Sequence, residues 1–139
     1  MKPQGFRILI VGVACLLAGC RPAHQLETAP VRGKVTLDGQ PLASGYVMAL
    51  PTRGRMARGA IQPDGSFALG TYGKADGAQI GKHPVVVTSV PSDESGGKPP
   101  KNAKPIPKKY GTAQSSGLTV NVESSGLDEW LIELTSSDE

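Results

Sequence analysis

Apolar and polar residues alternate along several short stretches of this chain. In Val31–Leu37, which reads VRGKVTL, every second residue from Val31 is apolar or glycine, and the residues between are polar. That period of two predicts a β-strand with one buried face. It recurs in Gly45–Leu50, Leu118–Glu123 and Trp130–Leu134, and Arg58–Ile61 can pair with the residues that follow it.

Turn-forming residues separate these stretches. The segment LDGQPL, residues 37–42, holds an Asp-Gly pair that suits a tight turn and a proline that prevents the strand from continuing. In QPDGSF, residues 62–67, proline, aspartate and glycine occupy the positions that a second tight turn favours. We expect Phe67 and Leu69, after this turn, to point inward.

A β-branched run, Val85–Val90, fits a central strand that is covered on both faces. Pro84 has no N–H to donate, so this strand is expected to begin at an edge or a bulge, or to enter its ladder only at Val85. The chain holds 18 Gly and 12 Pro, and no window has a helical apolar period. These features predict an all-β, antiparallel sandwich over residues 30–135, followed by a short tail, residues 136–139.

The first 20 residues have the order of features of an export signal. Two basic residues precede an uncharged apolar run, Ile8–Leu17, which is shorter than the about 20 residues that a membrane-spanning helix needs. Leu17, Ala18 and Gly19 then lead to Cys20. This order resembles the signal of bacterial lipoproteins, and the resemblance implies cleavage before Cys20 and lipidation of its thiol. The alternatives are an ordinary signal peptide with an incidental cysteine and an uncleaved anchor.

Cleavage at that point changes what the composition implies. The signal peptide, residues 1–19, contains two basic residues and Cys15, so its removal lowers the formal net charge from +3 to +1 and leaves Cys20 as the remaining cysteine. We therefore expect no internal disulfide and no binding of nucleic acid. Residues 20–29 are expected to be a lipidated, flexible tether. An aspartate directly after the lipidated cysteine would favour retention in the inner membrane. This chain has Arg21 at that position, so we expect placement in the outer membrane.

Several motifs occur in an order that resembles a known family. VRGKVTLDGQPLASGYVMAL is followed by IQPDGSFAL, DGAQIGKHPVVV, IPKKY and SGLTVNV. This set resembles the bacterial carboxypeptidase regulatory-like lipoproteins, whose domain is similar to transthyretin, and the resemblance extends from Val31 to about Leu134. It implies a seven-stranded Greek-key sandwich of the transthyretin or prealbumin type, without peptidase activity of its own. His83 departs from the family pattern, which usually has a tyrosine there.

Candidate catalytic and metal-binding groups are few. His24 and His83 have no cysteine or acidic residue at metal-ligand spacing. Asp38, Asp64 and Asp76 each precede a glycine, which indicates turns, with calcium binding by loops as the alternative. No serine lies in a nucleophile-elbow pattern, and no histidine is placed to act as its base. We therefore predict no catalytic residue, no metal site and no cofactor.

Residues 91–109 form a segment that is rich in proline and lysine and is expected to be an extended loop. Its five lysines are Lys98, Lys101, Lys104, Lys108 and Lys109. One interpretation is a solvated loop between strands. The sharper hypothesis is a contact arm for an anionic envelope polymer or for lipid headgroups. Tyr110, directly after the segment, is expected to pack at the end of the sandwich and not to bind sugar.

Together these patterns predict a non-catalytic, membrane-anchored envelope lipoprotein whose domain is structural or binds protein. Its expected partners are membrane lipid, through Cys20, and an envelope protein or polysaccharide. It would be attached to the cell membrane or outer membrane and face the periplasm or the cell exterior. The alternative is a carbohydrate-binding accessory module, which is disfavoured because sugar platforms need several exposed aromatic rings, and Phe67 and Trp130 fall on expected core faces.

Overall fold

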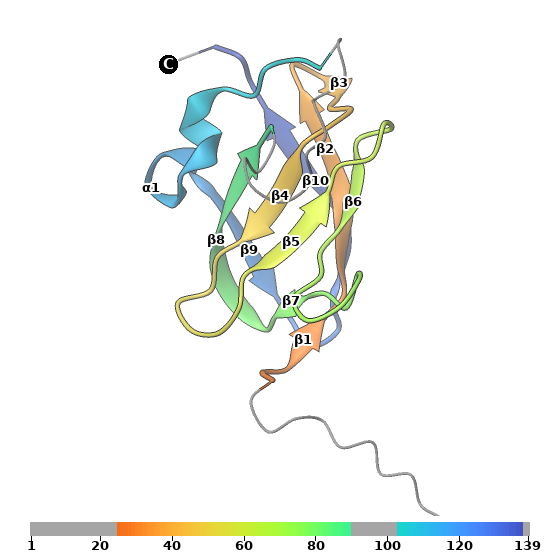
Figure 1. Ribbon diagram of the computed structural model, residues 1–139, viewed down its shortest axis with the longest axis vertical. Helices are drawn as coiled ribbons and strands as arrows, with labels where there is room; N and C mark the ends of the chain where they lie inside the picture. The colour runs from red at the N-terminus through yellow and green to blue at the C-terminus, as the bar shows by residue number, and fades with distance from the viewer. Residues whose placement is uncertain (1–24, 90–102, 138–139) are drawn as a thin grey trace, which may run out of the picture.

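Two four-stranded β-sheets enclose one apolar core in the computed structural model, which describes residues 25–89 and 103–137 (Figure 1). The first sheet consists of β10 (Leu127–Leu134), β2 (Val31–Leu37), β3 (Gln40–Pro41) and β6 (Ser66–Ala68). The second sheet, in order, consists of β5 (Ala57–Ala60), β4 (Tyr46–Ala49), β8 (Gly81–Thr88) and β9 (Leu118–Val122). The expected all-β class is therefore confirmed for the described residues.

One strand pair differs from the expected antiparallel arrangement. Strand β10 runs parallel to β2, with Trp130 beside Gly33 and Ile132 beside Val35. The prediction of a purely antiparallel sandwich is wrong at this pair, and the first sheet is mixed. The physical reason is the long connection: these two strands come from opposite ends of the domain, so no hairpin turn forces them to run in opposite directions.

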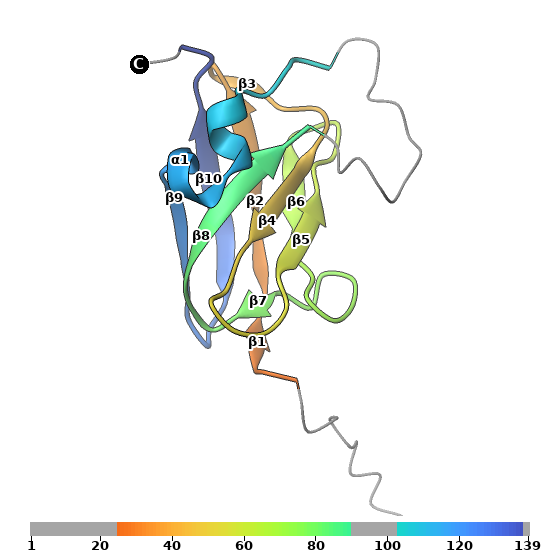
Figure 2. The ribbon, with the colours of Figure 1, turned by 60° about the vertical axis from the view of Figure 1, so that its left-hand side comes forward.

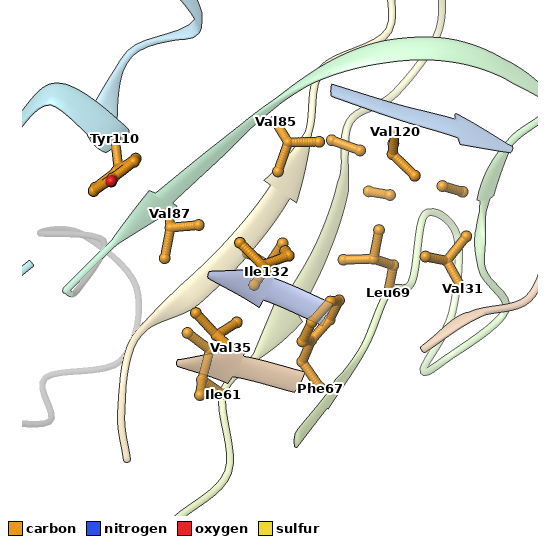
Figure 3. Packing of buried hydrophobic residues seen from close by; sticks show 14 of the residues in the cluster. Val31, Val35, Ile61, Phe67, Leu69, Val85, Val87, Tyr110, Val120 and Ile132 are labelled. Atoms are coloured by element: carbon orange, nitrogen blue, oxygen red, sulfur yellow. The ribbon is translucent and has the colours of Figure 1, made fainter. Parts of the chain in front are cut away.

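The core receives side chains from both sheets (Figure 3). Val31, Val35 and Leu37 of β2 are buried, which confirms the buried face that the alternation predicts. Phe67 and Leu69 are also buried, as expected. Burying a side chain of this size contributes about 1.5–3 kcal/mol, so this shared core is the main source of stability in the described region.

Pro84 lies inside β8, not before it. The strand begins at Gly81 and pairs with β9 from there, with Pro84 opposite Thr119. The carbonyl oxygen of Pro84 accepts a hydrogen bond from the Leu50 N–H at 2.9 Å. The nitrogen of Pro84 therefore faces the β4 side, where pairing begins only at Val85. The expectation that this strand enters its ladder only at Val85 is confirmed for its pairing with β4 and wrong for its pairing with β9, which begins at Gly81.

Short elements complete the two ends of the sandwich. Strand β1 (Thr28–Ala29) pairs with β7 (Ala78–Gln79), so the last residues of the expected tether are already part of the folded domain. At the opposite end lie the 3-10 helix η1 (Lys108–Gly111) and helix α1 (Ala113–Ser116), which contact β8 (Figure 2). The helices were not expected, because four residues are too few to show a helical period.

Tyr110 anchors this helical end to the core. Its side chain is buried, and its hydroxyl oxygen accepts a hydrogen bond from the Thr135 N–H at 3.0 Å. The expectation that Tyr110 packs at the end of the sandwich is therefore confirmed. The described part of the chain contains no helix with the length and apolar character needed to cross a bilayer.

Candidate binding groove

An open groove of about 1510 Å³ lies along the edge where β5 and β6 bring the two sheets together. We call it the cationic groove, after the basic side chains that line it. These are Arg32, Lys34, Arg55, Arg58 and Lys74. Two carboxylates, Asp128 and Glu129, line one part of it. The excess of cations makes the groove suited to an anionic ligand.

The hairpin that connects β5 and β6 lines the groove, and backbone hydrogen bonds join its two arms near both ends. Arg58 and Gly70 exchange two bonds of 2.9 and 3.0 Å, and the Gln62 N–H donates to the Ser66 carbonyl at 2.8 Å. Between these points Gly59 allows close approach, since a Cβ there would overlap the carbonyl of Ala68. The outer faces of the two sheets therefore meet along one continuous surface.

Asp64 holds the turn of this hairpin. Its Oδ1 accepts hydrogen bonds from the Ser66 N–H at 3.0 Å and from the Ser66 hydroxyl at 2.6 Å. These bonds, the side-chain one foremost, hold the pKa of the Asp64 carboxyl below its usual value, and the nearby positive charge of Lys34 adds to the effect. The prediction that Asp64 forms a turn is confirmed.

Strands β2 and β6, which pair with each other, supply the floor and one wall of the groove. Arg32 lies opposite Ala68 and Lys34 lies opposite Ser66, so the four side chains share the outer face of the sheet. Arg32 and Lys34 are exposed, and their partners across the ladder in β6, Ala68 and Ser66, have small side chains. Long cationic side chains therefore border a shallow floor.

The other wall comes from β4, β5 and the residues before β5. The Arg58 guanidinium carbon lies 5.3 Å from the centre of the Tyr46 ring, within the range of a cation–π contact. Met56, on this wall, is 50% exposed. On the β2 side, Leu131 lies next to Lys34 in the β10–β2 ladder and is 54% exposed. The groove thus presents apolar side chains next to its cations.

The loop at residues 70–77 lines part of the groove and carries Lys74. The Asp76 carboxylate accepts three backbone N–H bonds within this loop, from Thr71 at 2.7 Å, Tyr72 at 3.1 Å and Gly73 at 2.9 Å. Asp76 is therefore a turn-forming residue, as predicted. Its hydrogen bonds fix the part of the wall to which Lys74 belongs.

His83 and Asp38, two of the residues with candidate metal-binding chemistry, have structural hydrogen-bond partners. Within residues 25–89 and 103–137, no group of three or more His, Cys, Asp or Glu side chains is placed to hold a metal ion. His83 is buried, and its Nε2 lies 2.8 Å from the Gln79 carbonyl oxygen, so it has a structural hydrogen bond. Asp38 accepts a bond from the Ser136 N–H at 2.9 Å.

The predicted lysine arm falls only partly within the structure. Lys98 and Lys101 lie outside the described residues, as do the signal peptide and Cys20. Lys104 and Lys108 are exposed near η1, whereas the Lys109 ammonium donates to the Ser137 carbonyl at 2.8 Å. None of the three described lysines lines the cationic groove. The proposed contact with an anionic surface stays a prediction.

The basic residues of the groove were not predicted as a site. The alternation of Arg32 and Lys34 on the outer face of β2 was visible in the sequence, but joining them with Arg58 requires the pairing of β2 with β6 and the contact of β6 with β5. The character of the groove has to be read from its own residues, because no family model matches this chain and neither curated proteins nor solved structures gave a significant match.

Proposed function

We propose that this protein is a non-catalytic, membrane-anchored envelope lipoprotein whose β-sandwich acts as a protein-binding module. The observation that carries the anchoring is the order of two basic residues, the uncharged run Ile8–Leu17 and the sequence Leu17-Ala18-Gly19-Cys20. Cys20 would carry the lipid and hold the protein at the cell membrane or outer membrane.

The strand order supports a finer proposal about the fold. Three of the longer strands, β6, β2 and β10, face four others, β5, β4, β8 and β9, across the core. A division into three and four strands is compatible with the seven-stranded, transthyretin-like sandwich that the sequence motifs resemble. Such a domain supplies a rigid frame for binding and, by itself, says nothing about the ligand.

The composition of the cationic groove favours protein over sugar as the partner. Its exposed Met56 and Leu131 suit apolar side chains of a protein. The second candidate, a carbohydrate-binding module, is supported by Tyr46 and Trp130, which also line the groove. However, Arg58 stacks on the first ring, and the second packs edge to face against Phe67 at 5.8 Å.

The anchoring proposal can be tested on the full chain produced in a bacterial host. We expect mass spectrometry to find a mature N-terminal peptide that begins at a Cys20 carrying a diacylglyceryl group, and the protein to sediment with membranes. Cys20→Ser should abolish the lipid mass and leave the precursor uncleaved. Cys15→Ser is the matched control, because this cysteine lies in the removed segment, and it should change neither result. An unmodified Cys20 in the mature wild-type protein would refute the proposal.

A further inference from the structure

We propose that the cationic groove binds an extended, acidic segment of a partner protein, in which aspartate or glutamate alternates with small residues and an apolar residue occupies the next position on the same face. This inference rests on the proposed protein-binding function and names the chemistry of the partner. It concerns the outer surface of β2, β6 and β5, which is distinct from the lipid anchor and from the lysines near η1.

The spacing of the cations matches an extended peptide. Arg32 and Lys34 are two residues apart in β2 and lie on the same face, so their repeat along the strand is about 6.6–6.8 Å. Carboxylates at every second position of an extended peptide have the same repeat. A peptide lying along β2 can therefore place one carboxylate next to Arg32 and the carboxylate two residues further along next to Lys34.

The floor of the groove permits this approach. Ser66 and Ala68 of β6 and Ala60 of β5 present short side chains between the two cationic walls. A peptide can come close to the surface there, while Arg58 on the opposite wall supplies a further positive charge. Asp128 and Glu129 lie beside Arg32, between the β10 residues paired with Val31 and Gly33. They therefore weaken the attraction of a ligand carboxylate at Arg32 and leave Lys34 as the stronger contact.

The apolar contacts distinguish a peptide from an anionic polysaccharide. Leu131 lies directly beside Lys34 in the β10–β2 ladder and is half exposed. An apolar residue two positions after a carboxylate in an extended peptide faces the same side as that carboxylate, so it can contact Leu131 while the carboxylate contacts Lys34. A polymer of acidic sugars would use the cations but would leave Leu131 and Met56 without a matching apolar group.

The test uses the purified full chain in detergent micelles and a fluorescein-labelled peptide, Ser-Glu-Thr-Glu-Ser-Leu-Ser, whose two glutamates and leucine share one face when it is extended, read by fluorescence anisotropy. A peptide of the same composition with contiguous glutamates, Ser-Glu-Glu-Thr-Ser-Leu-Ser, is the ligand control, because its carboxylates lie on two faces when it is extended. We expect the first peptide to bind several-fold more tightly and its affinity to fall with added salt.

Variants of the protein locate the binding. Arg32→Gln together with Lys34→Gln should weaken binding of the first peptide about tenfold, since two exposed charge pairs are lost. Lys104→Gln with Lys108→Gln removes the same charge outside the groove and should leave the affinity within about twofold. Circular dichroism should be the same for both double variants, because all four side chains are exposed.

Three results would overturn the inference: equal binding of the two peptides, unchanged binding by the Arg32→Gln/Lys34→Gln protein, or displacement of the peptide by polygalacturonate at a lower carboxylate concentration. The last result would assign the groove to an acidic polysaccharide. Mass spectrometry of the Cys20 peptide from the same preparation separates the two proposals. Failure of peptide binding by a lipidated protein rejects the groove inference alone.

Discussion

At the scale of single residues, the aspartates that precede glycine show how much a short motif can predict. Asp64 and Asp76 form turns by accepting backbone N–H bonds, as the Asp-Gly pairs indicate. The sequence could not predict that Asp76 accepts three such bonds, because this requires residues 71–73 to curve around one carboxylate. Ala75 helps to produce that curve with a positive φ of 56°.

Replacement of Asp76 should therefore loosen one wall of the groove. In Asp76→Ala, three N–H groups lose their acceptor, and we expect the free energy of unfolding to fall by about 1–3 kcal/mol. Urea denaturation measures this loss, and amide exchange should accelerate at Thr71 and Gly73. Asp76→Asn keeps one oxygen acceptor and should lose less. Equal stability of Asp76→Ala and the wild type would show that the loop does not depend on this carboxylate.

At the scale of the elements, periodicity located the strands but not their partners. The alternation in Val31–Leu37 reproduces the bounds of β2, because a buried face leaves a local pattern. Strand β10 begins at Leu127, three residues before the predicted start at Trp130. The cause is a bulge, at which Glu129 adopts a positive φ of 63° and the period of two is interrupted. The parallel pairing with β2 is a long-range property that has no local signal.

Gly33 shows how closely β2 and β10 are packed. A Cβ at this position would overlap the Trp130 carbonyl oxygen and would lie 3.0 Å from the Phe67 ring. We therefore expect Gly33→Ala to destabilise the protein by at least about 2 kcal/mol, because the backbone of β10 must move. Gly111→Ala is the control, since its Cβ would meet no atom within 4 Å, and its effect should stay within about 0.5 kcal/mol. Similar midpoints of urea unfolding for both variants would contradict this account.

At the scale of the whole molecule, the candidate site was the least predictable feature. The lysine-rich segment stood out in the sequence because its five lysines lie close together in the chain. The cationic groove, in contrast, draws its charges from β2, β5 and two loops that are far apart in the chain. Only the packing of the two sheets brings Arg32 and Arg58 to one surface, so no scan of neighbouring residues could have found it.

The stability of the whole molecule should decrease in acid through two exposed carboxylates. The Ser136 N–H bonded to Asp38 and the Ser66 hydroxyl bonded to Asp64 hold the pKa of each carboxyl below its ordinary value of 3.8. Because the folded-state pKa is the lower one, the stabilisation is complete above about pH 5 and is lost as the pH falls below 3.8 through the folded-state pKa.

We expect Asp38→Asn together with Asp64→Asn to make the midpoint of urea unfolding less dependent on pH between about 2 and 5 than it is in the wild type. Glu123→Gln is the control at another exposed carboxylate and should retain more of the wild-type acid dependence. If the double variant and the wild type lose stability in parallel over this range, other carboxylates determine the acid sensitivity.

The pairing of β1 with β7 would give the protein a direction at a membrane if Cys20 carries lipid as proposed. Strand β1 lies at one end of the sandwich, and η1 lies at the other (Figures 1 and 2). Residues 21–27 span at most about 25 Å when fully extended, so lipidation at Cys20, as proposed above, would keep the β1 end within that distance of the bilayer. Lys104 and Lys108 would then lie at the end of the sandwich farther from the tether, where they would be available to a partner other than the leaflet that carries the lipid.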